Sequence, residues 1–540
     1  MTGRDYGVGL AALFALALSS LAANPSVNAQ PSRPSLLVLI VVDQFRGDYA
    51  ESYGHQWTDG LREIFQHGAV FTNAVVPYGQ TRTCTGHSSI ATGTLPSSHG
   101  MVDNEWFDRG TSRFVSCTED PAVSPVAIGP GRAVERHSPR FLRTPTLADE
   151  LRRQAVSPPR VVSLALKARS AISLVGHGGA RTFAMWEEDS GTWATSTAYA
   201  TVPAPDVASF LAAHPASAAR GALWERRLPI EAYLNEDRAP GEPAAAFPHS
   251  LRPPFGASFT PIWDASPFSD AYLGDLAVSM IASLGLGGTA GPGPDLLLMS
   301  FAALDYVGHS YGPKSHEIQD VLARLDVVLG RLIRTLDQSI GRDRYVLALT
   351  SDHGVAPLPT ETGGRVNLSA VGRAVDAALS SAFGRRPSVH AISGSSIYLA
   401  PGVIDTVRPN APLREAVDRA LLAVPGIARV YWSDQLTATD ATDDALLAAT
   451  RASYVPDRSG DLMFVPARNW VISDGGTNHG TPYDYDTRVP VALLGSRIVA
   501  GRHGTASSIV DVAPTLAALA GITMPRAQGR VLTEAMERLR

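Results

Sequence analysis

Residues 79–93, GQTRTCTGHSSIATG, are rich in side chains that can act as nucleophiles. The stretch holds six hydroxyl groups, one cysteine and one histidine, with a glycine at each end. A free hydroxyl is a weak nucleophile at neutral pH, so it needs a neighbouring base or a metal ion to activate it. The stretch therefore predicts a catalytic loop whose activating groups come from elsewhere in the chain.

Aspartate and histidine residues suited to metal binding occur at four other places. They are Asp43, the pair Asp305 and His309, the adjacent Asp352 and His353, and His479 in the glycine-rich segment GGTNHG. Zinc favours nitrogen and oxygen ligands at low coordination number. Six ligands exceed what one zinc ion with an open position needs, so the set predicts two ions with three protein ligands each.

Each aspartate of this set ends an apolar run. The runs are SLLVLIVVD, PDLLLMSFAALD and RYVLALTSD. Such runs are typical of strands buried on both faces of a parallel sheet, and residues 59–68 and 316–340 have the composition and spacing of covering helices. Ligands of α/β sheets bind beyond the carboxyl ends of the strands, so we expect the three carboxylates at one edge.

The charge balance and the N-terminal segment limit which partners and which cellular location are expected. The chain has 46 basic and 51 acidic residues, and this balance argues against a nucleic-acid partner. Residues 1–29 combine Arg4, an apolar run and a VNA cleavage pattern, which predicts a signal peptide and a periplasmic or secreted protein. No later run reaches about 18 unbroken apolar residues, so we expect no stable membrane insertion. Cys84 and Cys117 allow one disulfide, and their spacing leaves its formation open.

A second unit is predicted within the α/β fold. Residues 385–470 contain a strand pattern (SSIYLA), a helix pattern (APLREAVDRALLAV) and another strand pattern (IARVYWS), which indicate a small β-α-β lid subdomain. Residues 30–384 and 471–540 then form the catalytic domain, in which the sheet resumes at TRVPVALLG and a last helix begins near SSIVDVAPTLAALAGI. Residues 200–290, rich in proline, alanine and glycine, are interpreted as a further insertion.

Several segments together resemble the alkaline phosphatase superfamily: VVDQFRGDY, TRTCTGHSSIATGTLPSSHGM, LDYVGH, SDHG, NHG and DVAPTLAALAG. The likeness covers most of the chain after residue 29 and is strongest to the monomeric, zinc-dependent PafA-type phosphatases, with nucleotide pyrophosphatases/phosphodiesterases as relatives. It implies an alkaline-phosphatase-like α/β fold with a mostly parallel sheet flanked by helices. It also implies a monomer that holds two zinc ions per chain and hydrolyses small phosphate monoesters.

The resemblance implies roles for individual residues. The family nucleophile lies four residues before a histidine, which makes Thr83 the nucleophile and His87 a positioning residue. Zinc would lower the pKa of the Thr83 hydroxyl, and a phosphothreonine would form. Thr85 and Ser88 are expected to hold the loop through hydrogen bonds. The implied ligands of the two ions are Asp43, Asp352 and His353 with Thr83 for one, and Asp305, His309 and His479 for the other.

The choice between monoester and diester depends on donors for a third phosphate oxygen. The resemblance makes Asn104 one donor and places Lys167 and Arg169 in the register of a phosphate clamp. Residues two apart on a strand point to one side, so we expect both cations on an exposed strand. Lys167 is one of only two lysines, which favours a selected role, whereas Lys314 is expected at the surface. The alternative function is a phosphodiesterase or nucleotide pyrophosphatase with the same two-zinc site.

Three other classes fit less well. A sulfatase needs proline and arginine after its modified cysteine or serine, but Cys84 is followed by Thr85, Gly86, His87 and Ser88. A cofactor-independent phosphoglycerate mutase would be cytosolic and would use serine. An exported binding protein would not need a nucleophile together with six ligands.

Overall fold

The structure is a computed structural model that describes residues 33–537 except 203, 238–245, 289–292 and 385. The predicted signal peptide, residues 1–29, lies outside the described residues. Among the helices of the described residues, none is long and apolar enough to cross a membrane.

A ten-stranded mixed sheet forms the centre of the fold, in the order β21-β2-β20-β13-β1-β12-β7-β8-β9-β6. Its five middle strands run parallel to one another. They are β13 (Tyr345–Thr350), β1 (Leu36–Val42), β12 (Asp295–Phe301), β7 (Val161–Ala165) and β8 (Thr182–Glu187). Antiparallel strands flank them: β20 (Val491–Gly495) pairs with β13, and β9 (Trp193–Ser196) pairs with β8. The outer strands are β2 (Ala69–Phe71), β21 (Gly501–His503) and β6 (Pro125–Ala127).

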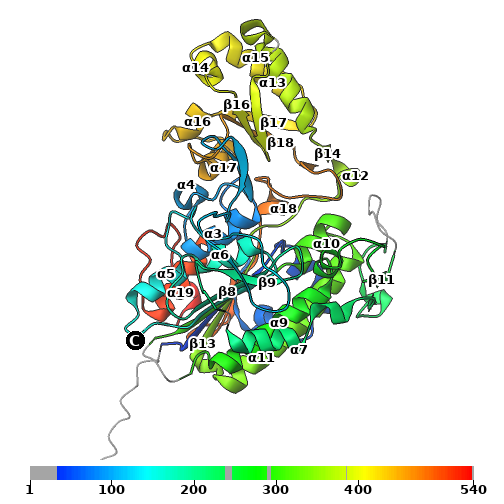
Figure 1. The fold of residues 1–540 in the computed structure, drawn as a ribbon, viewed down its shortest axis with the longest axis vertical. Coiled ribbons are helices and arrows are strands. Elements are labelled where there is room, and N and C mark those ends of the chain that lie inside the picture. Colours follow the sequence, from blue (N-terminus) through cyan, green and yellow to red (C-terminus); the bar gives the residue numbers. More distant parts are fainter. Residues whose placement is uncertain (1–32, 203, 238–245, 289–292, 385, 538–540) are drawn as a thin grey trace, which may run out of the picture. The chain divides into compact units, whose positions relative to one another are not determined.

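Both faces of the sheet are covered, as the unbroken apolar runs predict. All seven residues of β1 are buried, and alternate side chains enter two different hydrophobic clusters. Burying one such side chain stabilises the fold by about 1.5–3 kcal/mol. The helices on one face are α2 (Gly60–His67), α9 (Pro267–Leu284) and α11 (His316–Ser339); those on the other are α3 (Thr83–Thr92), α5 (Leu147–Gln154), α6 (Ala168–Val175) and α19 (Val512–Ala520). Figure 1 shows α9 and α11 opposite α5 and α19. The predicted α/β class is confirmed.

The three predicted aspartate-bearing runs are neighbouring strands. They form β1, β12 and β13, and their carboxyl ends lie together because the strands are parallel. Asp43 follows β1 directly, and Asp352 is the second residue after β13. Asp305 lies one step further on, in the first turn of α10 (Ala303–Tyr311). The predicted convergence at one sheet edge is confirmed.

The segment predicted as a lid has its own four-stranded antiparallel sheet, in the order β15-β16-β18-β17. The predicted elements are β16 (Ser396–Leu399), α15 (Ala411–Leu422) and β17 (Ile427–Trp432). However, β18 (Leu462–Pro466) lies between the two predicted strands, and β15 (Val389–Ser393) completes the edge. The simple β-α-β unit is therefore part of a larger sheet. Its core also includes residues of α13 (Leu368–Phe383), which precedes the predicted boundary at 385.

The region predicted as an insertion, residues 200–290, is only partly peripheral. Its last helix, α9, is 18 residues long and packs on the sheet through Leu273, Leu276 and Ala277. The sequence pattern misses this helix because apolar residues surround it on several sides instead of forming one stripe.

Candidate metal centre and active site

The first ligand group consists of Asp43, Asp352 and His353, all fully buried. His353 Nε2 lies 3.5 Å from Asp43 Oδ1 and 3.3 Å from Asp352 Oδ2. Asp43 Oδ1 and His353 Nε2 have no hydrogen-bond partner among the described residues. Unpaired polar atoms are costly inside a protein, and two that converge with the Asp352 carboxylate on one point fit a bound cation.

The second group consists of Asp305, His309 and His479. Asp305 Oδ1 lies 3.2 Å from His309 Nε2 and 3.7 Å from His479 Nε2. The ring of His479 stacks on the ring of His353 at 3.6 Å, so the two groups are adjacent. The structure thus brings together all six predicted metal ligands, in the two predicted sets.

The three histidines are oriented in the same way. Each places Nδ1 within hydrogen-bond distance of a backbone carbonyl: His309 with Thr477 at 2.9 Å, His353 with Gly354 at 3.0 Å, and His479 with Thr81 at 2.6 Å. A proton on Nδ1 leaves Nε2 as the electron-pair donor that faces the group, an arrangement common in metal-binding histidines. Burial lowers the pKa of His479 well below its usual value, which favours the neutral, metal-binding form.

Negative charge accumulates between the two groups. Burial and the carboxylates of Asp305 and Asp352 raise the pKa of Asp43 to about 6. The Lys167 ammonium donates to Asp43 Oδ2 at 2.6 Å and to Asp305 Oδ2 at 2.5 Å. Burial alone would lower the pKa of Lys167, but these carboxylates raise it above its ordinary value. Three carboxylates and one ammonium leave a net negative charge at the site, and this charge fits the binding of divalent cations.

Thr83 is the first residue of α3 and is buried. The helix start contacts the first ligand group, because His87 Nδ1 lies 2.9 Å from the Thr83 carbonyl oxygen and 3.1 Å from Asp352 Oδ2. Gly86 allows this approach, since a Cβ there would overlap Asp352. His87 Nε2 lies 2.7 Å from Ser300 Oγ. His87 therefore connects the helix, the strand β12 and the ligand group, as a positioning residue would.

The predicted catalytic loop is a helix instead. Residues 83–92 form a buried α-helix with Arg82 as N-cap. Thr85 and Ser88 lie inside it, and neither hydroxyl has a hydrogen-bond partner among the described residues. The predicted loop-holding role of Thr85 and Ser88 is therefore wrong. Hydroxyl-rich composition favours turns in isolation, but burial against the sheet overrides this local preference.

Asn104 lies beside the start of α3. Its Oδ1 accepts a hydrogen bond from the Cys84 backbone N–H at 2.8 Å, which leaves its amide group as the available donor. Cys84 and Cys117 form a disulfide, and the Cys117 N–H donates to the Asn104 carbonyl oxygen at 2.9 Å. This disulfide, whose formation the sequence left open, therefore joins α3 to the segment that carries Asn104.

The strand prediction for Lys167 and Arg169 is wrong. Strand β7 ends at Ala165, Lys167 is the N-cap of α6, and Arg169 lies in its first turn. Residues two apart on a helix do not face each other, so the period-two argument for a shared phosphate fails. The Lys167 ammonium contacts carboxylates of both ligand groups. Arg169 is half-buried, and its Nε has no hydrogen-bond partner within the described residues. Lys314 is exposed, as expected.

The family model of type I phosphodiesterase / nucleotide pyrophosphatase matches residues 37–504. The chain belongs to this family. Alkaline phosphatase PhoV of Synechococcus elongatus is 29% identical over 531 residues, 95% of each chain. Alkaline phosphatase PhoK of Sphingomonas is 30% identical over 539 residues, 94% of this chain and 92% of PhoK. The crystal structure of alkaline phosphatase PafA matches with a TM-score of 0.83 at 28% identity, over 94% of this chain and 99% of PafA.

Membership of the phosphodiesterase family, together with these relatives, confirms the predicted enzyme class. The protein is a hydrolase of phosphate esters, related to alkaline phosphatases. The family implies a metal cofactor. The two ligand groups suit metal binding, because they contain buried polar atoms without hydrogen-bond partners among the described residues and carry net negative charge. The contacts of α3 with the first ligand group are those of His87 and Gly86 with Asp352, and the role of Thr83 stays a prediction.

One buried residue of this phosphodiesterase-family site is absent from the sequence-based predictions. Gln44 follows Asp43 and contacts aspartates of both ligand groups. No periodic pattern or metal-ligand chemistry marks a glutamine. Its place next to a predicted ligand at a strand end is the one signal that could have found it.

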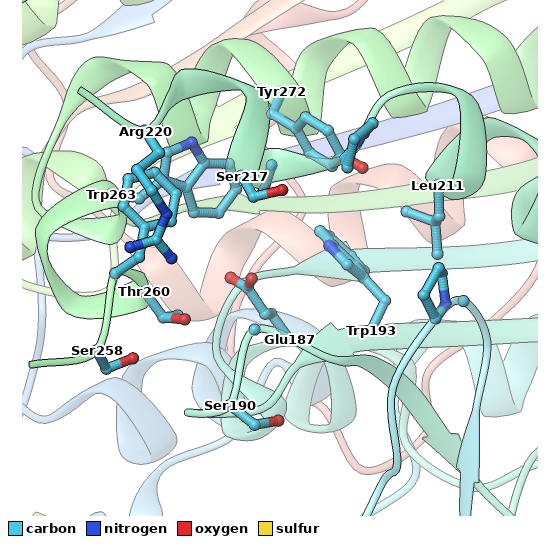
Figure 2. Close-up of a pocket in the computed structure, with 16 residues that line it drawn as sticks. Glu187, Ser190, Trp193, Leu211, Ser217, Arg220, Ser258, Thr260, Trp263 and Tyr272 are labelled. Atoms are coloured by element: carbon cyan, nitrogen blue, oxygen red, sulfur yellow. The ribbon is translucent and has the colours of Figure 1, made fainter. Parts of the chain in front are cut away.

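A cavity of about 270 Å³ opens elsewhere on this member of the family (Figure 2). Glu187 and Trp193 lie on its wall, with Trp263, Arg220 and Tyr272 around them. None of the predicted site residues lines it. Burial and the neighbouring carboxyl group of Asp264 raise the pKa of Glu187 to about 9. Two carboxyl groups this close share a proton at neutral pH.

This acid pair predicts a loss of stability at alkaline pH. Because folding raises the pKa of Glu187 from 4.5 to about 9, the folded protein keeps a proton that the unfolded chain releases. The stabilisation is complete below pH 4.5 and is lost as pH rises toward 9, with a slope of at most about 1.4 kcal/mol per pH unit. Urea unfolding in excess zinc between pH 6 and 9 measures the slope. Glu187→Gln should flatten it, and exposed Glu231→Gln should not; equal slopes in wild type and Glu187→Gln would contradict the shared proton.

Proposed function

We propose that the protein is an exported, monomeric phosphomonoesterase that uses two zinc ions and a covalent phosphothreonine at Thr83. The observation that carries the proposal is the meeting of two three-ligand groups at the carboxyl edge of the sheet, beside the start of α3. Relatives named alkaline phosphatase over nearly their whole length support the monoester substrate class. The disulfide supports export, because disulfides persist in oxidising compartments.

In this proposal each ligand group holds one ion. Asp43, Asp352 and His353 would hold the ion next to Thr83, and Asp305, His309 and His479 would hold the other. Bound zinc supplies Lewis-acid chemistry: it lowers the pKa of a bound hydroxyl or water and neutralises phosphate charge.

The chain contributes the nucleophile and the positioning. The Thr83 oxygen gives up its proton to solvent and forms a bond to phosphorus while the bond from phosphorus to the alcohol oxygen breaks, and the departing oxygen takes up a proton from water. Water then attacks the phosphothreonine, which releases inorganic phosphate and restores the hydroxyl. Helix α3 begins at Thr83, so the positive end of its dipole lies at the nucleophile and would stabilise the developing negative charge. His87 fixes the helix start.

Three side chains would bind the phosphoryl oxygens that the metal ions leave uncovered: Asn104, Lys167 and Arg169. A monoester has three non-bridging oxygens and a diester has two, so extra donors favour the monoester. The Asn104 amide is oriented by the Cys84 N–H. The Lys167 ammonium lies at the junction of the two ligand groups, although binding to phosphate requires it to exchange a carboxylate for the substrate.

Replacing Lys167 with alanine should lower kcat/KM for an aryl phosphate monoester about 10²-fold or more, because one charge-stabilising donor is lost. The value for a diester with the same leaving group should fall less, so the monoester/diester ratio drops. Arg169→Ala should shift the ratio in the same direction. Steady-state kinetics with both esters measures it.

Lys314→Ala provides the matched control, because Lys314 is the other lysine and is exposed. An unchanged ratio in Lys167→Ala and Arg169→Ala would exclude the clamp. A wild-type enzyme that prefers the diester would instead support the alternative function, a phosphodiesterase or nucleotide pyrophosphatase, which the description of the family model favours.

A further inference from the structure

Gln44 has an unusual backbone for a buried residue. Its φ is 70°, in the left-handed region that residues other than glycine rarely adopt. Six non-glycine residues have positive φ in the described part of the chain, and Gln44 is the only one of these six that is buried. A rare conformation held in the interior next to Asp43 indicates a functional constraint.

The contacts of Gln44 connect the two ligand groups. Its backbone N–H donates to Asp352 Oδ1 at 3.3 Å, in the first group. Its side-chain Nε2 donates to Asp305 Oδ1 at 2.6 Å, in the second group. Asp305 Oδ1 is the same atom that faces His309 Nε2 and His479 Nε2. The amide of Gln44 therefore fixes the carboxylate oxygen around which the second group is assembled.

The neighbouring chain leaves room for this amide. Gly308 lies between Asp305 and His309 on α10, and a Cβ at this glycine would overlap Gln44 Oε1. The φ of Gly308 is not positive, so its backbone would accept alanine. The absent side chain is therefore required by Gln44 and not by the conformation of the helix.

From these contacts we infer that Gln44 is a positioning residue that sets the spacing of the two ligand groups and orients Asp305 for the second metal ion. The inference rests on the proposed two-zinc function. A hydrogen bond to a carboxylate ligand restricts its rotation, and loss of such a partner lowers metal affinity about 10- to 100-fold. The chemistry requires an amide of this length: methionine has no donor, and asparagine is one methylene shorter.

The test is zinc binding at equilibrium. Wild type and Gln44→Met are dialysed against a series of buffered free zinc concentrations, and zinc per chain is measured by mass spectrometry of the metal. Wild type should hold two ions at concentrations where Gln44→Met holds one, with affinity for the second ion lowered about 10- to 100-fold. Gln44→Asn should show the same loss of affinity. Because asparagine tolerates the left-handed backbone, this variant replaces Gln44→Met in the test if the methionine variant does not fold.

Gln56→Met separates positioning from general packing. Gln56 is also buried, and its Nε2 donates at 2.8 Å to both the Ala232 carbonyl oxygen and Gln319 Oε1, groups outside the two ligand sets. The Gln56→Met variant should hold two zinc ions, as wild type does. Equal zinc affinities in wild type and the Gln44 variants would overturn the inference, while a wild type that binds no zinc would overturn the proposed function itself.

A double substitution tests the contact without relying on Gln44 alone. Gly308→Ala should weaken the second zinc site in the wild-type background, because the new methyl group displaces the Gln44 amide. In a Gln44→Ala background the overlap is removed, so the same substitution should have little further effect. Equal losses in both backgrounds would show that Gly308 does not act through Gln44 and would overturn the inference.

Discussion

Thr83→Ala is expected to abolish hydrolysis of phosphate monoesters, with kcat/KM lower by about 10³-fold or more, because the oxygen that attacks phosphorus is removed. Enzyme quenched in acid during turnover should yield a peptide of residues 83–92 that carries a phosphate on Thr83, and the alanine variant should yield none. Mass spectrometry of the digested protein detects the modification.

Two further variants in α3 show whether the effect depends on the hydroxyl of residue 83. Thr83→Ser keeps a hydroxyl at the start of α3 and should retain the phosphopeptide. Thr85→Ala removes a buried hydroxyl that has no hydrogen-bond partner among the described residues, so it should remain active. A fully active Thr83→Ala, or a phosphate found on another residue, would exclude the assigned nucleophile.

Removal of metal should have a similarly large effect on both activity and stability. A chelator leaves the buried carboxylates of Asp43, Asp352 and Asp305 without cations other than Lys167. Loss of each ion should lower the free energy of unfolding by about 2.7 kcal/mol where zinc is present at a hundred times its Kd. Activity should fall below about a thousandth and return when zinc is added. The measurements are a thermal unfolding scan and aryl phosphate turnover before and after chelation.

The same experiment on Asp352→Asn provides the comparison. This variant removes one charged ligand from the first group, so its Tm should respond less to the chelator than that of wild type. An unchanged Tm and undiminished activity of wild type after complete removal of metal would contradict the two-ion account.

The sequence predicted the ligand groups well because their elements carry strong local patterns. Asp43 and Asp352 end apolar runs that are typical of buried strands, and parallel neighbours bring their carboxyl ends together. His479 is different, since it lies far along the chain and its Nδ1 contacts the Thr81 carbonyl oxygen. The glycine-rich segment made it a candidate ligand, but its place in the second group came from family resemblance, because long-range packing of this kind leaves no local pattern.

The errors occur where tertiary contacts override local preference. The hydroxyl-rich residues 83–92 form a helix because all ten are buried against the sheet and its neighbours. Lys167 and Arg169 have the spacing of neighbours on one side of a strand, yet β7 ends at Ala165 and α6 begins immediately after Lys167. Strand β18 joins the lid sheet from about thirty residues further on, and a pairing over such a distance follows from topology and not from local period.

Diffraction from crystals of the zinc-loaded enzyme, collected on both sides of the zinc absorption edge, tests the central claim most directly. The account predicts two anomalous peaks, one among Asp43, Asp352 and His353 and one among Asp305, His309 and His479, with the Thr83 hydroxyl bound to the first. A single peak, or a first ion that Thr83 does not contact, would contradict it.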